Sequence, residues 1–241
     1  QFSLLTTRRF LPLFVAQGIG AFNDNGLRNA ITILITFDLA VNHGWNATLF
    51  VQAGTALFIL PYFLFSAIAG QFADKFDKAF IAQRVKLAEI GAMAFGAGAL
   101  WLDNPYLDLM VLFFAGSLAA FFGPVKYGIL PQYLKKDEVI AGNAMIEMGT
   151  FVTILLGTMF GGFLVIDTGG RQILSGALIL LAVIAWYATI RMPPAPSTTP
   201  DLEIDWKNVV ENYVEDYHFP IGHPGLSALM EPRYDREVRP E

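Results

Sequence analysis

The sequence has no cysteine, only three histidines and few charged residues. Without cysteine, disulfide bonds and every metal site that needs a thiolate ligand are excluded. Charged residues make up 15% of the chain, whereas soluble proteins carry about 25%. The basic residues form no patch interleaved with aromatic side chains, so nothing predicts a nucleic-acid partner. The low charge argues against a soluble protein.

What the sequence does contain is apolar. Hydrophobic residues account for 54% of the chain, and the mean hydropathy is +0.48. Glycine (22 residues) and phenylalanine (21 residues) are both abundant, as is usual in packed membrane helices. The net charge of −5 conceals a split, because residues 1–200 carry a balance of +1 and residues 201–241 a balance of −6. This asymmetry predicts a boundary near residue 200.

Residues 10–38 form an apolar stretch with Asp24 and Arg28 near its middle. As a helix it would span roughly 43 Å, and about 20 residues suffice to cross the hydrocarbon core. The stretch is too long for a signal-peptide core and lacks a small-residue cleavage site, so we expect a retained helix. Because the chain starts at Gln1 rather than Met, we expect it to be trimmed or incomplete.

The two charged residues of this stretch allow two interpretations. A charge at the bilayer centre costs about 2.5–3.5 kcal/mol even on a forgiving scale, which favours Asp24 and Arg28 as the lining of a polar cavity. Alternatively, because they are four residues apart on one helix face, they neutralise each other and tie the helix to its neighbours.

Six hydrophobic segments, separated by polar or proline-containing interruptions, predict six membrane helices. They cover residues 10–38, 47–72, 79–102, 106–122, 139–166 and 172–190. The fourth helix is expected to be interrupted after Phe122 by Gly123-Pro124 and Pro131. Pairs of small residues four apart, Ala92 with Gly96 and Gly157 with Gly161, predict close helix contacts.

Basic residues gather on one side of these six segments if the chain crosses the membrane at each. Placing the N-terminus inside assigns ten of them to the cytoplasmic side and only Arg171 to the other. The ten are Arg8, Arg9, Lys75, Lys78, Arg84, Lys86, Lys126, Lys135, Lys136 and Arg191. By the positive-inside rule, both termini are therefore expected in the cytoplasm.

Residues 70–78, GQFADKFDK, lie between the second and third segments and resemble the G-x-x-x-D-[RK]-x-x-[RK] signature of the major facilitator superfamily. The resemblance implies a loop that latches the cytoplasmic gate. The residues that match the signature are Gly70, Asp74, Lys75 and Lys78. Asp77 replaces the usual second glycine, which leaves the turn geometry open. The alternative is an ordinary basic loop.

Three further stretches resemble the lysophospholipid transporter branch of that superfamily: AFNDNGLRNA (21–30), FFGPVKYGILPQYL (121–134) and NAMIEMGTF (143–151). The resemblance covers roughly residues 1–191. It implies a cofactor-free transporter that flips lysophospholipids across the bacterial inner membrane for re-acylation.

The charged and amide residues of the apolar segments suit such a cargo. Arg28 has the planar fork that pairs with phosphate, and Asp24 or Glu147 can meet an amine. Amides that offer hydrogen bonds are Asn23, Asn25, Asn29 and Asn143. Glu147 can equally bind Lys126 or cap a neighbouring helix. Lys126, at a Pro-interrupted helix end, is either a substrate contact or an interfacial anchor.

After a Pro/Ser/Thr linker (192–202), residues 203–241 change character. They resemble the start of the catalytic domain of Rieske-type ring-hydroxylating oxygenases, W-K-x-x-x-E-N-x-x-E-x-Y-H-x4-H-P. The resemblance implies His218 and His223 as ligands of non-haem iron and Glu215 as the carboxylate that couples the iron to the Rieske cluster.

The oxygenase-like segment lacks parts that a Rieske-type oxygenase needs for catalysis. A Rieske cluster needs two cysteines, the third iron ligand should lie beyond the end of the chain, and about 40 residues cannot bury a catalytic core. We therefore predict no enzyme, and iron only if the segment belonged to a complete oxygenase. A solvated acidic tail remains open, but a join of two unrelated coding segments is preferred.

The sequence thus predicts an all-α membrane protein: one six-helix half of a major-facilitator transporter (1–191), a linker, and a short, mostly irregular extension. A full transporter places its substrate between two six-helix halves, so we expect a fragment or a partnership with a second half or a second copy. The rival hypothesis is a membrane-anchored oxygenase fragment, or a chimeric coding sequence without integrated function.

Overall fold

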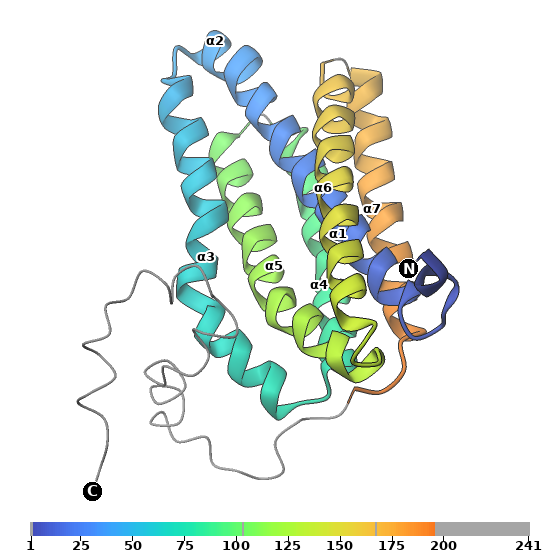
Figure 1. The fold of residues 1–241 in the computed structure, drawn as a ribbon. Coiled ribbons are helices and arrows are strands. Elements are labelled where there is room, and N and C mark those ends of the chain that lie inside the picture. The colour runs from blue at the N-terminus through green and yellow to red at the C-terminus, as the bar shows by residue number, and fades with distance from the viewer. Residues whose placement is uncertain (1, 103, 167, 196–241) are drawn as a thin grey trace, which may run out of the picture. The chain divides into compact units, whose positions relative to one another are not determined.

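The computed structural model describes residues 2–102, 104–166 and 168–195, and every regular element within these ranges is a helix (Figure 1). Six of the helices are long. The elements are η1 (Phe2–Thr6, a 3₁₀ helix), α1 (Leu11–Leu34), η2 (Ile35–Leu39, a π-helix), α2 (Ala40–His43), α3 (Ala47–Lys75), α4 (Lys78–Ala99), α5 (Pro105–Tyr133), α6 (Val139–Leu164) and α7 (Thr168–Ile190).

The first long helix extends further than the apolar pattern predicts. α1 passes without a break through the π-helical turn η2 into α2, so helical backbone continues to His43. The apolar pattern ends the first helix at residue 38, which predicts that Asn42 and His43 lie in the polar interruption that follows, and that prediction is wrong. The chain turns only at Gly44, whose φ of +68° lies in the left-handed region that favours glycine.

Polar residues at the interruptions start the next helices. The side chains of Asn46, Asp77 and Asn104 accept hydrogen bonds from the backbone N–H groups of the first turns of α3, α4 and α5, at 3.1, 2.9 and 3.0 Å. Such caps satisfy donors that have no partner within the helix. Pro105 at the first position of α5 has no N–H to leave unsatisfied.

Several predicted boundaries need correction. The expected interruption after Phe122 is absent, because α5 continues through Pro124 and Pro131 to Tyr133. Membrane helices tolerate internal proline since neighbouring helices and local adjustments satisfy the freed backbone groups. α4 ends at Ala99 instead of Leu102, and α7 begins at Thr168, so the glycines predicted to lie in a loop belong to its first turn.

Four of the long helices are apolar and long enough to cross a membrane: α3, α5, α6 and α7. α1 and α4, with 24 and 22 residues, have the length but carry more polar residues. The chain is therefore an all-α membrane protein whose two most polar long helices lie among four apolar ones.

The long helices pack chiefly in the pairs α1 with α6, α3 with α5, and α4 with α7 (Figure 1). Small residues bring the backbones of α1 and α6 together: a Cβ atom added to Gly157 would lie 2.3 Å from the carbonyl oxygen of Phe22, and one added to Gly161 would lie 2.0 Å from that of Gly26. A Cβ on Gly96 would lie 2.7 Å from a methyl group of Leu27. The predicted close contacts at these glycines are confirmed.

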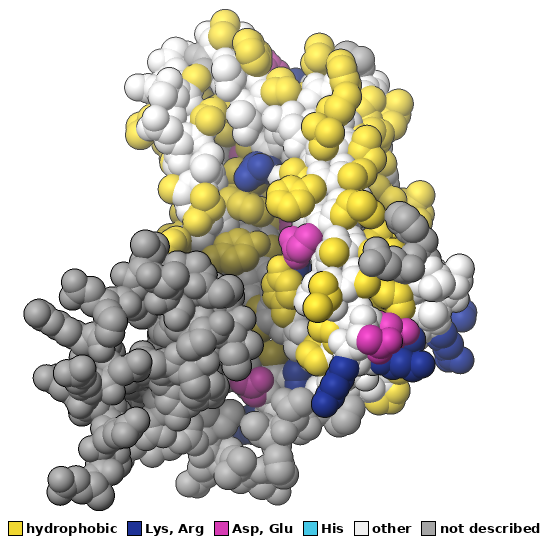
Figure 2. Space-filling view, in the orientation of Figure 1, with side chains coloured by type: hydrophobic (Ala, Val, Ile, Leu, Met, Phe, Trp, Pro, Cys, Tyr) yellow, Lys and Arg dark blue, Asp and Glu magenta, His cyan; other side chains and the backbone are white. Residues whose placement is uncertain are grey.

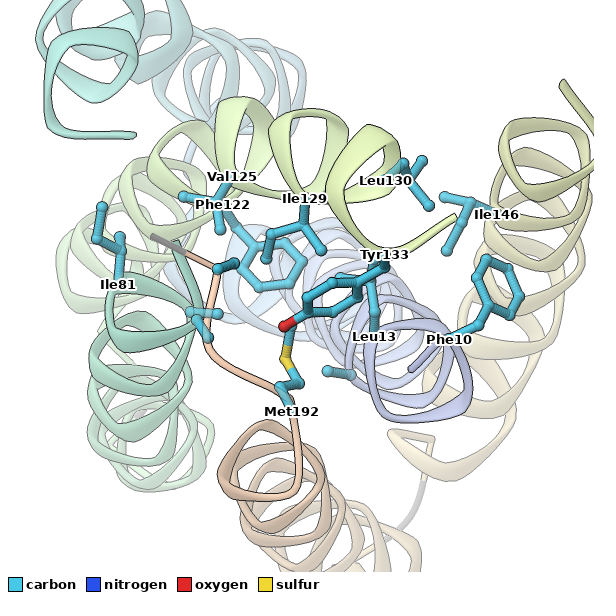
Figure 3. Packing of buried hydrophobic residues seen from close by; sticks show 14 of the residues in the cluster. Phe10, Leu13, Ile81, Phe122, Val125, Ile129, Leu130, Tyr133, Ile146 and Met192 are labelled. Atoms are coloured by element: carbon cyan, nitrogen blue, oxygen red, sulfur yellow. The ribbon is translucent and has the colours of Figure 1, made fainter. Parts of the chain in front are cut away.

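Apolar side chains form two clusters along the bundle. One includes Phe10, Leu13, Ile129, Tyr133 and Met192 (Figure 3). The other is built from residues further along α1 and α4 and from the first half of α7. On α1 and α4, the residues between the two clusters (17–26 and 86–92) include several charged and amide side chains: Gln17, Asn23, Asp24, Asn25, Lys86 and Glu89.

The segment after α7 packs against the start of α4. The N–H of Ala195 donates to the carboxylate of Asp77 at 3.0 Å, and the N–H of Lys78 donates to the carbonyl of Ala195 at 2.8 Å. The hydroxyl of Tyr133 donates to the carbonyl of Pro193. These bonds hold the chain leaving α7 beside the loop between α3 and α4.

Candidate functional site

A polar cavity of about 480 Å³ lies among five of the long helices, α1, α3, α4, α5 and α6. Its charged lining residues are Asp24, Arg28, Lys86, Glu89 and Lys126. Figure 2 shows a hollow on this face of the bundle, with basic and acidic side chains inside it and hydrophobic side chains around it. The interpretation of the first segment as the lining of a polar cavity thus agrees with the structure.

The α1 wall of the cavity carries Asp24, Asn25 and Arg28. The guanidinium of Arg28 donates to the side-chain oxygen of Asn25 at 2.8 Å and lies 5.3 Å from the ring centre of Phe58 on α3. Neither Asp24 nor Arg28 forms an ion pair within 4.0 Å among the described residues. Asp24 and Arg28 therefore do not form an ion pair with each other, although their charges interact.

The α4 wall carries a buried ion pair that the sequence analysis did not assign to the site. The ammonium of Lys86 lies 2.5 Å from Oε2 of Glu89, and the two side chains are 4% and 5% exposed. The same ammonium lies 4.5 Å from the ring centre of Phe122 on α5. Asp24 is close enough to interact electrostatically with both members of the pair.

A second, more open pair joins α5 to α6. The ammonium of Lys126 lies 3.5 Å from Oε1 of Glu147, and the hydroxyl of Tyr127 donates to the same oxygen at 2.7 Å. The Glu147 side chain is 40% exposed, whereas that of Lys126 is 11% exposed. Of the alternatives for Glu147, the contact with Lys126 is the one observed.

The positions of two lysines also correct the count of loop charges. Lys86 and Lys126 were assigned to the cytoplasmic side, but both are buried and line the cavity. Apart from Arg84, which lies in the second turn of α4, the remaining basic residues of that group lie near the N-terminus, in or next to two loops, and just after α7, all at one end of the bundle (Figure 1). Arg171 pairs with Asp38 at 2.7 Å, at the beginning of α7.

The amide residues divide into two groups. Asn25 lines the cavity. Asn29 donates to the carbonyl of Thr158 on α6 at 2.8 Å, and Asn23 donates to that of Leu178 on α7 at 3.0 Å. Neither of these two lines the cavity, nor does Asn143. Asn23 and Asn29 therefore join helices in the structure.

The predicted gating loop is short. α3 ends at Lys75 and α4 begins at Lys78, so Gly70, Asp74 and Lys75 lie in the last turns of α3. A Cβ on Gly70 would meet no atom of another described helix within 4 Å. Asp77 has a φ of −57°, which any residue adopts, and it caps α4. The backbone at position 77 therefore does not require a glycine.

The oxygenase-like part of the sequence lies outside the described residues. This applies to Glu215, His218 and His223, and to the linker beyond Ala195. Within 2–102, 104–166 and 168–195, no group of three or more metal-ligating His, Asp or Glu side chains is present.

Several cavity residues were missed by the sequence analysis. They are Phe58, Tyr62, Lys86, Glu89, Phe122 and Tyr127. A signal existed only for Lys86 and Glu89, since charges three residues apart within an apolar helix share one face and have to be sheltered. The aromatic residues carry no such signal, because the sequence contains many of them.

Comparisons with known proteins identify the family to which the sequence is similar. The sequence model of the Major Facilitator Superfamily matches residues 13–230. The chain is 30% identical over 213 residues to the lysophospholipid transporter LplT of Klebsiella pneumoniae, an alignment that covers 87% of this chain and 49% of the relative. LplT of Yersinia enterocolitica is 32% identical over 163 residues (66% and 37%), and LplT of Serratia proteamaculans is 29% identical over 204 residues (82% and 46%). The chain spans about half the length of the curated relatives it matches.

Proposed function

The chain belongs to the Major Facilitator Superfamily, and we propose on this premise that it takes part in moving lysophospholipids across the bacterial inner membrane by alternating access. The observation that carries the proposal is the cavity: an apolar bundle encloses charged side chains, one of which, Arg28, has no carboxylate partner within 4.0 Å among the described residues. The proposal assigns no catalytic step and no cofactor to the chain.

The head group of a lysophospholipid fits the charges on α1. The phosphate pairs with the planar fork of Arg28, which Asn25 and Phe58 hold in place. Where the head group carries an amine, Asp24 is its partner, one helical turn away. Glu147 already accepts from Tyr127 and lies beside Lys126, which makes Asp24 the more available carboxylate.

The acyl chain needs an apolar surface next to the head group. Phe58, Leu118, Phe122 and Ile154 line the same cavity as Arg28, so a single ligand can contact both kinds of residue. This combination of a few charged groups and an otherwise apolar wall is typical of ligand sites in proteins.

A second six-helix half, or a second copy, completes the transporter in this proposal. α3 and α6 leave large apolar side chains exposed, among them Phe63 (81%) and Phe151 (68%). Part of this surface faces lipid and part faces the second half, as in superfamily members with substrate sites between two halves.

The proposed orientation places both ends of the six-helix unit in the cytoplasm. The loop between α3 and α4, together with Gly70, Asp74, Lys75 and Lys78, then lies at the cytoplasmic end, where it latches the gate. Its support is the excess of basic residues at that end, which remains large without Lys86 and Lys126.

Uptake of a labelled lysophospholipid into vesicles that contain the protein tests this function. We expect uptake above protein-free vesicles, loss of that uptake in Arg28→Ala, and unchanged membrane insertion of the variant. Arg84→Ala is the matched control, because Arg84 lies outside the cavity and stacks on the exposed ring of Phe80. Near-normal uptake by Arg28→Ala refutes the role of Arg28, and no uptake by the wild type refutes the function.

A further inference from the structure

One buried oxygen in the cavity wall has no hydrogen-bond partner among the described residues. It is Oε1 of Glu89, whose other oxygen, Oε2, is held by Lys86 at 2.5 Å. The Glu89 side chain is 5% exposed, and the residue lines the cavity. An unsatisfied buried acceptor is costly, so an oxygen kept in this state calls for a donor from outside the protein.

The ion pair packs directly against α1 at Gly20, which lines the same cavity as Lys86 and Glu89. Gly20 of α1 faces the ion pair, and a Cβ atom there would lie 2.2 Å from the ammonium of Lys86 and 3.6 Å from Oε1 of Glu89. The absence of a side chain at Gly20 thus lets the pair border the cavity. The ammonium of Lys86 holds the Glu89 carboxylate through Oε2, which leaves Oε1 available to a donor.

We propose that Oε1 of Glu89 accepts a hydrogen bond from the free glycerol hydroxyl of a lysophospholipid, and so distinguishes it from a phospholipid with two acyl chains. This inference rests on the proposed function. A lysophospholipid carries a hydroxyl where a diacyl lipid carries an ester, and an ester has no hydrogen to donate. Asp24 and Arg28 hold the head group on α1, and the glycerol that follows it lies beside α4.

The chemistry predicts rejection of ligands that lack the hydroxyl. A ligand without a donor leaves the carboxylate oxygen unpaired and displaces any water that could satisfy it. Sites built to bind a hydroxyl discriminate strongly against analogues without one. A single charged hydrogen bond corresponds to a discrimination of about tenfold or more.

The test compares two ligands that differ only at this hydroxyl: lysophosphatidylethanolamine and the same lipid with the glycerol hydroxyl converted to a methyl ether. Their dissociation constants for the full chain in lipid nanodiscs are measured by equilibrium binding. We expect the methyl ether to bind about tenfold more weakly. Equal affinities overturn the hydroxyl inference while the proposed function stands. If neither lipid binds, the proposed function fails and the inference fails with it.

Two variants locate the effect. Lys86→Met/Glu89→Met removes the acceptor and its partner together, so no unpaired charge remains, and both ligands should then bind equally. Arg84→Ala, which removes a charge outside the cavity, should keep the tenfold preference. A preference that survives in the double variant contradicts the role of Glu89. If the double variant does not fold, the comparison of the two ligands on the wild type still decides.

Discussion

The charged side chains on two sides of the cavity differ in whether they form ion pairs. On α4, and between α5 and α6, basic and acidic side chains are paired with each other, most closely in Lys86 and Glu89. On α1, Asp24 and Arg28 have no ion-pair partner within 4.0 Å among the described residues. Asn25 and the ring of Phe58 are the contacts of the arginine.

The difference separates groups that are satisfied within the protein from groups that are available to a ligand. A paired charge contributes to holding helices together, and removing one partner leaves the other unsatisfied. An unpaired charge in a cavity keeps its binding capacity for an incoming ligand. We therefore expect ligand charges to bind on the α1 side, and the following variants test that division.

Lys86→Met should destabilise the protein most, because it leaves the carboxylate of Glu89 buried without its partner. Breaking a buried pair costs about 3–5 kcal/mol. Lys86→Met/Glu89→Met should recover most of that loss, since no charge is left unpaired. Denaturant unfolding in detergent micelles measures both. A single variant as stable as the wild type would contradict the paired role of Lys86.

Arg28→Lys should weaken lysophospholipid binding by about tenfold with little change in stability. Lysine keeps the charge but lacks the planar fork that engages a phosphate with two parallel hydrogen bonds. No ion pair is broken, so unfolding should resemble that of the wild type. The measurements are equilibrium binding and denaturant unfolding of the same preparation. Loss of stability without loss of affinity would show that Arg28 stabilises the fold and does not bind the ligand.

Lys126→Met should have a smaller effect on stability than Lys86→Met, at most about 1 kcal/mol. Its partner Glu147 is 40% exposed and keeps the hydrogen bond from Tyr127. Denaturant unfolding of Lys126→Met and Lys86→Met under identical conditions compares the two losses of unfolding free energy. Equal destabilisation by the two substitutions would show that the difference in burial between the two ion pairs does not change how much each contributes to stability.

The smallest effect is expected for an ion pair outside the membrane helices, Arg9 with Glu138 at 2.7 Å. The hydrogen bond from Arg9 and that from the backbone of Lys135 hold the pKa of Glu138 below its ordinary value of 4.5. The stabilising contribution is therefore complete above pH 4.5 and is lost as the pH falls through the lowered pKa. Glu138→Gln should lower the unfolding temperature slightly at pH 7 and not at all at about pH 2. A difference that is independent of pH would disprove the assignment.

The sequence predicted the parts of the fold that depend on local chemistry. Long apolar runs between polar interruptions predicted the extent of α3 and α6 to within a few residues. The caps at Asn46 and Asn104 were not predicted, although both residues lie in those interruptions. The length of α5 was not predictable in this way. Whether Pro124 and Pro131 end a membrane helix depends on the neighbours that satisfy the freed carbonyls, and these come from tertiary packing.

The cavity was predicted in part for a similar reason. A charge in the middle of an apolar helix has to be sheltered, which identified Asp24 and Arg28. The sequence does not say which amides of α1 point at the cavity and which point at another helix, so Asn29 was grouped with Asn25 although it bonds to α6. Lys86 was assigned to the cytoplasmic side and Glu89 was given no role, because their burial becomes visible only once α4 is packed against α1 and α5.

Photo-crosslinking shows whether a lysophospholipid head group binds in the cavity beside α1. The ligand is a lysophospholipid that carries a photoreactive group next to its phosphate, and peptide mapping identifies the labelled residues. We expect labelling within residues 17–28 of α1 and on the facing part of α4, and competition by unlabelled lysophospholipid. Labelling confined to the outer faces of α3 and α7, unaffected by competitor, would contradict it.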